Sequence, residues 1–235
     1  HEIVDPHSTA EVLIESLGLP LVLKPRDSSG GRGYRLCRDS KAVTAELHAN
    51  DLAETFIEGQ ELSVESFVQN GQILFTNITR YYLQWVINVL PYRLEKYLHD
   101  LVLEFNAEVI KRFAVVQGLV HMEMYLTRDG PVFGEIALRP PGGYIMKLLK
   151  LSYGFDPWIA FAKMESGGFF QFPRHANLYS AAWVIHPGAG TVDRIEGLKQ
   201  LQEIPQIIEQ RIRLRPGQKV TERQSSGESH GYILL

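Results

Sequence analysis

The sequence predicts an α+β fold in which antiparallel β-hairpins are interspersed with short helices. Three observations support this class. Asn70-Gly71 and Asp129-Gly130, two strong hairpin-turn signals, each separate two strand-like stretches. Residues 94–109 carry apolar side chains at i, i+3, i+4 and i+7, the spacing of an amphipathic helix. Residues 173–235 become strand-like again, with Gly and Pro turns between the segments, which predicts a small β-rich C-terminal part.

Composition and charge exclude several classes of protein. The 235 residues suffice for one large domain or two small ones, and 45% hydrophobic with 22% charged residues is ordinary for a soluble globular protein. A net charge of −3 gives no electrostatic reason to expect nucleic acid or an anionic membrane as partner. The single cysteine, Cys37, cannot form an internal disulfide, and no apolar run reaches the ~18 residues of a membrane span. With no signal peptide at the start, we expect a cytoplasmic protein.

Two short helices are expected in the first 50 residues. Residues 8–11 (Ser-Thr-Ala-Glu) have the pattern of a capping box and Gly18 suits a C-cap, which predicts a helix over about 9–17. Residues 40–49 have the composition of a second short helix, and residues 52–57 of a strand or linker.

A glycine-rich loop follows the first strong strand signal. The strand at 19–25 carries Lys24 near its end, residues 28–33 form the loop (Ser-Ser-Gly-Gly-Arg-Gly), and residues 34–37 are strand-like. Because the loop joins strand to strand, neither a Walker loop nor a Rossmann fingerprint applies. Its backbone N–H groups can still form a nest for phosphates, with Lys24 as a counter-charge. The alternative is a flexible surface turn.

The middle of the chain predicts a hairpin and further helices. Strands are expected at 62–69 and 72–80, a helix at 145–153, and another from an N-cap at Asp156 with Pro157 at N1 to about residue 166. The helix over 94–109 is expected to bury a stripe made of Leu94, Tyr97, Leu98, Leu101, Val102, Phe105 and Val109. The C-terminal strands are expected at 179–186, 206–214, 219–223 and 232–235.

Residues 120–139 are predicted to form a hairpin that carries several ionisable side chains. Apolar residues alternate with His121, Glu123 and Tyr125 on its first strand, which is typical of a half-buried strand. A second alternating run, which includes Glu135, ends at Arg139. His121, like His230, is expected to be structural or solvated rather than catalytic, and no two histidines have metal-ligand spacing.

The register of this hairpin decides whether its two acids meet. A three-residue loop, 128–130 with a glycine bulge, pairs Thr127 with Pro131 and puts Glu123 opposite Glu135. A two-residue loop would put Glu123 opposite Ile136. Like charges facing each other destabilise a sheet unless a cation lies between them. The hairpin therefore predicts a carboxylate pair for Mg²⁺ beside an anion-binding guanidinium, and the alternative is a pair of solvated surface acids.

Four features, in this order, resemble the ATP-grasp fold and most closely its carboxylate–amine ligases. The resemblance covers roughly residues 1–170, and residues 175–235 resemble the β-rich tail of some members. The matching positions are Lys24 with Gly30, Gly31 and Gly33 for the phosphate-binding lysine and lid; Glu54, Thr55, Phe56 and Ile57 for the adenine hinge, with Glu61 for the ribose-binding acid; Glu123 and Glu135 for the Mg²⁺ ligands; and Arg139 with Gly142-Gly143 for the acyl-phosphate site.

The sequence departs from the family pattern in two ways. Ala137 stands where many members have an Asn ligand two residues after the second acid. Members also normally carry a preceding α/β domain with a first ATP-contacting lysine, which these residues do not contain. We therefore expect the 235 residues to hold most of the nucleotide site and to lack part of the substrate site.

The resemblance implies two α+β subdomains with antiparallel sheets that grip ATP, followed by a small β-rich unit. Residues 1–57 would be the lid subdomain, 58–172 the large subdomain with the metal site, and 173–235 the C-terminal unit. The implied enzyme uses ATP and Mg²⁺ (or Mn²⁺) to activate a small-molecule carboxylate as an acyl phosphate, joins it to an amine and releases ADP. The sequence leaves undecided whether the protein forms a homodimer. The alternatives are a phosphotransferase on the same fold, an ATP-binding module without catalysis and a purely structural interaction domain.

Overall fold

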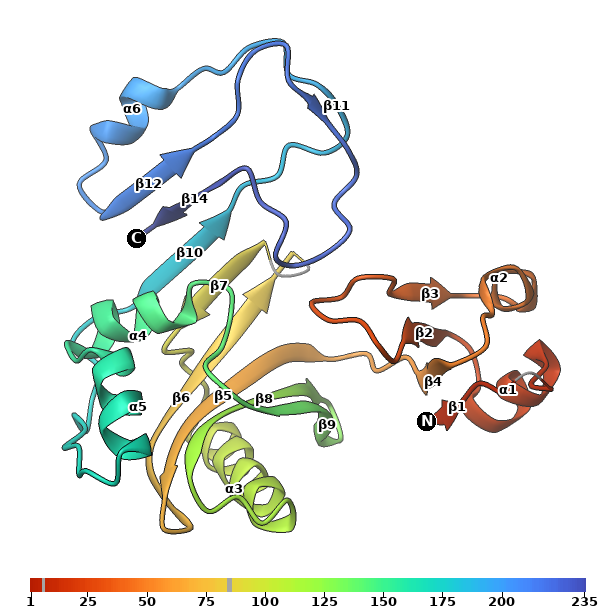
Figure 1. Cartoon of the computed structure of the whole chain (residues 1–235), viewed down its shortest axis with the longest axis horizontal. Helices are drawn as coiled ribbons and strands as arrows, with labels where there is room; N and C mark the ends of the chain where they lie inside the picture. The colour runs from red at the N-terminus through yellow and green to blue at the C-terminus, as the bar shows by residue number, and fades with distance from the viewer. Residues whose placement is uncertain (6, 84–85) are drawn as a thin grey trace. The chain divides into compact units, whose positions relative to one another are not determined.

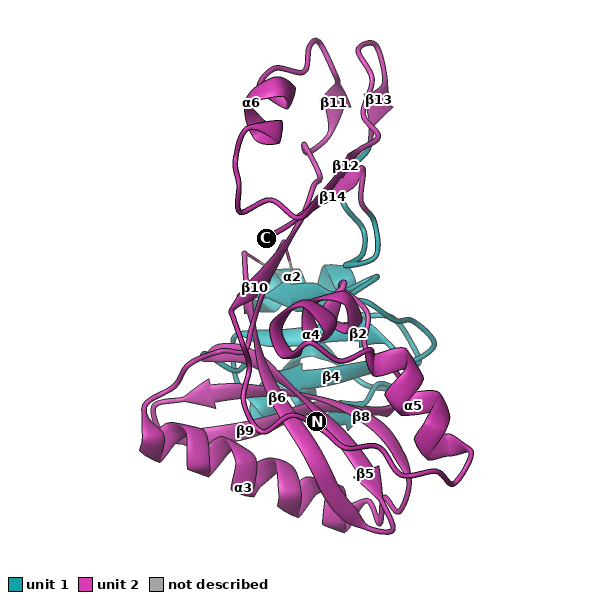
Figure 2. Ribbon diagram, turned by 90° about the vertical axis from the view of Figure 1, so that its left-hand side faces the viewer, with its two compact units in different colours: residues 1–58, 221–228 teal, residues 59–220, 229–235 magenta. Residues whose placement is uncertain are grey.

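The chain folds into two compact units. The computed structural model describes residues 1–5, 7–83 and 86–235. Unit 1 contains residues 1–58 together with 221–228, and unit 2 contains residues 59–220 and 229–235 (Figures 1 and 2). Among the helices that the structure describes, none is long and apolar enough to cross a bilayer.

Unit 1 is a four-stranded antiparallel sheet with two helices. The sheet has the order β1-β4-β2-β3, and its buried side chains, among them Leu13, Leu21 and Val43, form one core. The elements are β1 (Glu2–Ile3), α1 (Ala10–Leu17), β2 (Leu21–Pro25), β3 (Arg35–Cys37), α2 (Ser40–Glu46) and β4 (Asp51–Thr55).

Both helices of unit 1 begin at a side-chain cap, with two differences from expectation. The N-cap of α1 is Thr9, which accepts the N–H of Val12, while Ser8 instead accepts the N–H of Asp5. The second helix, α2, ends at Glu46 rather than at residue 49. The Asp51 carboxylate accepts the His48 N–H, so the chain after α2 turns into β4 instead of extending the helix.

Unit 2 is organised around an eight-stranded antiparallel sheet. Its order is β12-β14-β10-β7-β6-β5-β8-β9. The strands are β5 (Gln60–Gln69), β6 (Gln72–Tyr82), β7 (Ile87–Leu90), β8 (Gly118–Thr127), β9 (Gly130–Leu138), β10 (Ser180–Val184), β12 (Glu209–Ile212) and β14 (Gly231–Leu234). A separate pair consists of β11 (Gly190–Thr191) and β13 (Lys219–Val220), and a short helix, α6 (Leu198–Gln202), lies between β11 and β12 in sequence.

Helix α3 (Lys96–Arg112) covers one face of this sheet (Figure 2). Val102, Val109 and Ile110 pack in one core with residues of β5 and β8. The expected stripe is wrong at one position, because Tyr97 is 74% exposed. The helix turns that side chain away from the sheet and buries Asn106 instead, which donates a hydrogen bond to Ser66 Oγ at 2.9 Å.

Helices α4 (Ile145–Tyr153) and α5 (Pro157–Glu165) pack with the second core of unit 2. This core includes Phe67 and Phe75 of the sheet. The predicted cap of α5 is confirmed: Asp156 accepts the N–H groups of Trp158 and Ile159, and Pro157 occupies the first turn.

The C-terminal strands join the main sheet. β10 pairs with β7 over four residue pairs, from Ser180↔Leu90 to Trp183↔Ile87, and β14 pairs with β10. Residues 173–220 and 229–235 therefore belong to the same compact unit as residues 59–172. The predicted β-rich part thus contributes three strands, β12, β14 and β10, to one end of the large sheet.

Candidate active site

The β8–β9 hairpin brings Glu123 directly opposite Glu135. The turn and the pairing that produce this register differ from both the three-residue and the two-residue loop considered in the sequence analysis. Thr127 pairs with Gly130 across a two-residue turn, and the Thr127 hydroxyl accepts the Asp129 N–H and donates to the Gly130 carbonyl. A β-bulge then shifts the register between Glu123 and Met124, so that Gly134 is the extra residue. The expected three-residue loop is wrong, and the expected opposition of the two acids is confirmed.

The close approach of the strands at the bulge favours glycine. A Cβ on Gly134 would lie 3.0 Å from the carbonyl oxygen of Glu123. Without the bulge, the same turn would place Gly134 opposite Glu123 and turn Glu135 to the other face of the sheet. The close approach of the two backbones therefore keeps both carboxylates on one face.

This carboxylate pair fits the requirements of a magnesium ion that arrives with a nucleotide. The Glu123 side chain is 34% exposed and Glu135 is exposed, so both can reach a ligand. Ala137 lies opposite His121 and offers no oxygen. Within the described ranges, no three His, Cys, Asp or Glu side chains form a metal cluster. Mg²⁺ commonly binds through one or two carboxylates plus phosphate oxygens, so two acids suffice only together with a phosphate ligand.

A buried carboxylate that the sequence reasoning missed lies on the same face. Glu65 is fully buried, and its two oxygens accept hydrogen bonds from three strands. Oε1 accepts from Ser63 Oγ at 2.6 Å and from His121 Nδ1 at 3.1 Å. Oε2 accepts from Asn77 Nδ2 and Thr79 Oγ1, both at 2.7 Å. These bonds offset the cost of removing a carboxylate from water.

His121 connects this buried carboxylate to the hairpin acids. His121 is 6% exposed, which excludes the solvated alternative, and its Nε2 donates to Glu123 Oε1 at 3.2 Å. Burial lowers the pKa of His121, but the hydrogen bonds to Glu123 and Glu65 outweigh it and raise the pKa to about 9. The signal in the sequence was the alternation of Glu61, Ser63 and Glu65 with Leu62 and Val64.

Arg139 and the glycine pair Gly142-Gly143 lie in the segment between β9 and α4. Arg139 is exposed, directly after the last residue of β9, and its Nη1 donates to the Pro140 carbonyl at 3.0 Å. Gly143 has a φ of 60° and its carbonyl accepts from Asn88 Nδ2 at 2.6 Å. A Cβ at Gly143 would meet the same nitrogen at 2.6 Å, so this position favours glycine.

In unit 1, the predicted phosphate-binding lysine forms an ion pair. Lys24 Nζ lies 2.6 Å from Glu54 Oε2, and the two side chains are 34% and 29% exposed. The pairing Val22↔Glu54 between β2 and β4 places them on neighbouring strands. A phosphate that binds Lys24 must therefore compete with the Glu54 carboxylate.

The glycine-rich loop joins β2 to β3, as expected for a strand-to-strand connection. Gly30, Gly31 and Gly33 have φ values of 63°, 74° and 76°, which favour glycine. A Cβ on Gly33 would lie 2.7 Å from Pro25 Cγ. The Gly30 carbonyl accepts the N–H of Ser226 at 2.7 Å, so a C-terminal segment of unit 1 contacts this loop.

The predicted hinge residues are partly engaged within unit 1. Thr55 Oγ1 donates to the Leu17 carbonyl at 3.0 Å, and the Phe56 N–H donates to the Pro20 carbonyl at 3.1 Å. Ile57 follows them outside the strand. Glu61, the predicted ribose acid, pairs with Tyr125 across β5 and β8 in unit 2.

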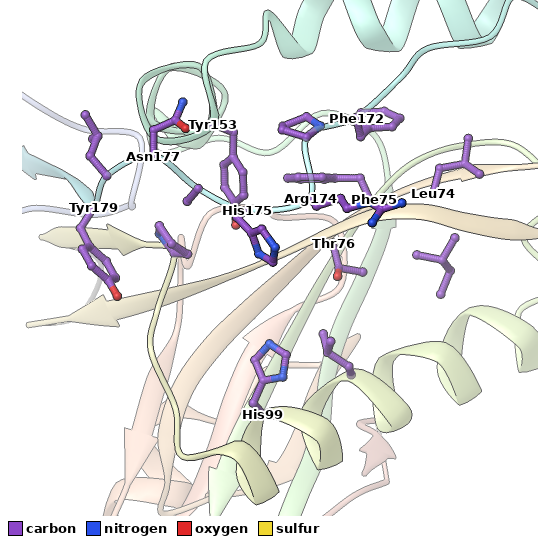
Figure 3. Close-up of a pocket in the computed structure, with 16 residues that line it drawn as sticks. Leu74, Phe75, Thr76, His99, Tyr153, Phe172, Arg174, His175, Asn177 and Tyr179 are labelled. Atoms are coloured by element: carbon purple, nitrogen blue, oxygen red, sulfur yellow. The ribbon is translucent and has the colours of Figure 1, made fainter.

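Unit 2 also holds an open pocket of about 710 Å³ that includes none of the predicted site residues (Figure 3). It is lined by β6, by His99 of α3 and by the segment that carries Arg174 and His175. Tyr153 lines it as well and donates its hydroxyl to Asn77 Oδ1 at 3.1 Å.

Comparison with known families shows where the chain belongs. A family model described as the ATP-grasp domain matches residues 2–143, more than half of the chain. The chain belongs to the ATP-grasp family. A second model, the L-amino acid ligase C-terminal domain 2, matches residues 182–235 of this ATP-grasp chain.

Two curated relatives are similar to this ATP-grasp chain. An L-arginine-specific L-amino acid ligase of Bacillus subtilis is 25% identical over 238 residues, which cover 90% of this chain and 56% of the relative. Dapdiamide A synthase of Enterobacter agglomerans is 26% identical over 243 residues, which cover 92% and 57%. The chain thus spans a little over half the length of these relatives.

Solved structures share the ATP-grasp fold. An L-amino acid ligase from Bacillus licheniformis aligns with a TM-score of 0.79 at 19% identity, over 100% of this chain and 62% of that one. A carboxyaminoimidazole ribonucleotide synthase from Aspergillus clavatus, determined in complex with ATP, aligns with a TM-score of 0.74 at 18% identity, over 96% and 59%. The predicted α+β ATP-grasp fold is confirmed.

Proposed function

We propose that this chain is the nucleotide-binding part of an ADP-forming, ATP-dependent carboxylate–amine ligase. The observation that carries the proposal is the face-to-face placement of Glu123 and Glu135 by the Gly134 bulge, within the residues that match the ATP-grasp domain. The name of the Bacillus subtilis relative and that of the C-terminal family model support amino acids as the carboxylate and the amine.

The two acids of unit 2 would hold Mg²⁺ or Mn²⁺. When bound, the metal ion supplies positive charge to the phosphate oxygens on which negative charge grows. Two carboxylates facing each other repel in the absence of a cation, so binding of the metal relieves a repulsion built into the hairpin.

The remaining residues would bind ATP and the reacting group. In unit 1, Lys24 and the backbone N–H groups of Gly30, Gly31 and Gly33 would bind phosphates, and residues 54–57 would contact adenine. In unit 2, Glu61 would accept hydrogen bonds from the ribose hydroxyls. Arg139 would stabilise the negatively charged acyl phosphate and the tetrahedral species that follows it.

The proposed chemistry has two steps. A carboxylate oxygen attacks the γ-phosphorus, the bond from that phosphorus to the β–γ bridging oxygen breaks, and ADP leaves. The free amine then attacks the carbonyl carbon of the acyl phosphate, the carbon–oxygen bond to phosphate breaks, and inorganic phosphate leaves. The nitrogen gives its extra proton to solvent, so the products are an amide, ADP and phosphate.

One observation favours a second candidate, an ATP-binding module without catalysis. Ala137 leaves the hairpin with one oxygen ligand fewer than many family members have. This module would bind ATP and produce no ADP.

The test uses the full-length protein with ATP, Mg²⁺ and mixtures of amino acids. The ligase produces ADP and free phosphate in step with amide, detected by coupled assay and mass spectrometry. A phosphotransferase would produce ADP and a phosphorylated acceptor without free phosphate, and the binding module would produce no ADP. Either result would overturn the ligase assignment.

A further inference from the structure

We propose that the buried pair formed by Glu65 and His121 is a positioning device for the metal-binding acid Glu123. The inference rests on the proposed metal site and adds two residues to it. The observation that carries it is a chain of two hydrogen bonds through the His121 ring. Nδ1 lies 3.1 Å from Glu65 Oε1, and Nε2 lies 3.2 Å from Glu123 Oε1.

The inner end of this chain is fixed by the sheet. Glu65 lies opposite Asn77 on one neighbouring strand and opposite His121 on the other. Tyr153 donates to Asn77 Oδ1, which directs the Asn77 amide nitrogen toward Glu65 Oε2. With Ser63 and Thr79 also donating to it, the Glu65 carboxylate has no freedom to rotate.

At the other end of the chain, His121 restricts the orientation of Glu123 in the proposed metal site. Both ring nitrogens of His121 contact carboxylate oxygens, so the plane of the ring is set. The bond to Glu123 is made at Oε1 and thereby orients the Glu123 carboxylate. Carboxylates and histidines that bind metals are held by hydrogen bonds of this kind, and the loss of such a bond typically weakens metal binding by about 10–100-fold.

The composition of the hairpin makes this orientation important. Glu123 and Glu135 are the two acidic residues in the sequences of β8 and β9, and Ala137 supplies no oxygen opposite His121. Glu135 is exposed, whereas Glu123 accepts a hydrogen bond from the buried His121. A purely structural role for Glu65 and His121 would instead affect only the stability of the sheet.

The test measures Mn²⁺ affinity of the full-length protein by electron paramagnetic resonance, with a non-hydrolysable ATP analogue bound. In His121→Asn the amide can replace Nδ1 and bind Glu65, but it cannot reach Glu123. In His121→Gln the amide can replace Nε2 and bind Glu123. We expect a loss of about 10–100-fold in Mn²⁺ affinity for His121→Asn and a clearly smaller loss for His121→Gln.

Glu65→Gln tests the remote end of the chain, because Glu65 does not contact Glu123. We expect a loss of Mn²⁺ affinity in the wild-type background and no further loss in the His121→Asn background, since both act through one bond. Asn106→Ala is the matched control: Asn106 is a buried polar residue on α3 that bonds Ser66. It should lower the melting temperature and leave Mn²⁺ affinity unchanged.

The outcomes separate this inference from the proposed function. If wild-type protein binds Mn²⁺ but folded His121→Asn and Glu65→Gln bind it within twofold of wild type, the positioning role is overturned while the metal site stands. If Glu123→Gln and Glu135→Gln also bind as wild type does, the metal site itself is overturned, and the inference with it. Melting temperatures identify any variant that fails to fold. If His121→Asn does not fold, the Mn²⁺ affinities of His121→Gln and Glu65→Gln decide whether the positioning role holds.

Discussion

At the scale of single residues, the opposition of Glu123 and Glu135 places two like charges across one ladder, and His121 contacts only the first of them. Each carboxylate faces a like charge across the ladder, and Glu135 has no burial that would justify its place in the fold. Gly134 gives up a side chain so that the two backbones can approach. A hairpin built only for stability would need neither feature.

Glu135→Gln should therefore move stability and activity in opposite directions. Removal of one charge relieves the repulsion, so we expect the melting temperature of the metal-free protein to stay the same or rise slightly. ADP formation should fall by roughly 10²-fold or more, as for the loss of one preorganised charge-stabilising group. Thermal unfolding and a coupled ADP assay check the two effects. Wild-type turnover in this variant would contradict the metal assignment.

Gly134→Val should damage the site through the backbone. Its Cβ would lie 3.0 Å from the Glu123 carbonyl oxygen, so the two backbones must move slightly apart at the bulge. We expect a loss of about 1–3 kcal/mol in the free energy of unfolding, typical of overpacking, together with weaker Mn²⁺ binding. Gly71→Val, at a hairpin turn where φ is 73° and a Cβ meets nothing within 4 Å, is strained through its own backbone and controls for a loss of stability away from the bulge. Equal Mn²⁺ affinity in both variants would argue against a role for the bulge.

At the scale of elements, the helices α4 and α5 are joined by a charged cap. Asp156 Oδ1 accepts two N–H groups at the start of α5, and Oδ2 lies 2.6 Å from Lys150 Nζ near the end of α4. The bond to Lys150 keeps the pKa of the Asp156 carboxyl below its ordinary 3.8, and the helix N–H groups act in the same direction. One carboxylate thus holds the two helices that pack with Phe67 and Phe75.

This cap gives a pH dependence of known sign. Because the folded pKa of Asp156 is lower than 3.8, its stabilisation is present above that pH and is lost as the pH falls through the folded pKa. Asp156→Asn keeps an N-cap acceptor but has no charge, so its stability should fall less steeply between pH 5 and pH 3 than that of wild type. Urea unfolding at a series of pH values measures this slope. Identical slopes would show that the carboxylate does not titrate with folding.

At the scale of the whole molecule, two compact units divide the predicted site residues between them. Lys24 and the glycine-rich loop belong to unit 1, and the two hairpin acids belong to unit 2. The one cysteine of the chain, Cys37, is 1% exposed in the core of unit 1. Burial raises the pKa of its thiol, so it reacts slowly until that unit opens.

Cys37 therefore reports whether ATP binds unit 1. If ATP binds only while unit 1 is folded, ATP at 100 times its Kd should slow labelling of Cys37 by about 100-fold, and Lys24→Ala should need more ATP for the same protection. The rate of reaction with a thiol-specific disulfide reagent measures this effect. Labelling that is equally fast with and without ATP would contradict nucleotide binding by this unit.

The sequence by itself determined the features that depend on residues a few positions apart. The alternation around Glu123 and Glu135, the Asp156-Pro157 cap and the glycine-rich loop between two strands are local patterns, and the structure contains each of them. The ATP-grasp fold itself was predicted from the resemblance of four motifs, in their order, to that family.

Only the tertiary structure decided how distant segments meet. The bulge at Gly134, the burial of Glu65 and the exposure of Tyr97 depend on which backbone or side chain lies opposite each residue. The pairing of β10 with β7, 90 positions apart at Ser180 and Leu90, likewise has no local signal. The reason is that burial and register are set by long-range packing, and a one-residue change in pairing reverses the face on which every following side chain lies.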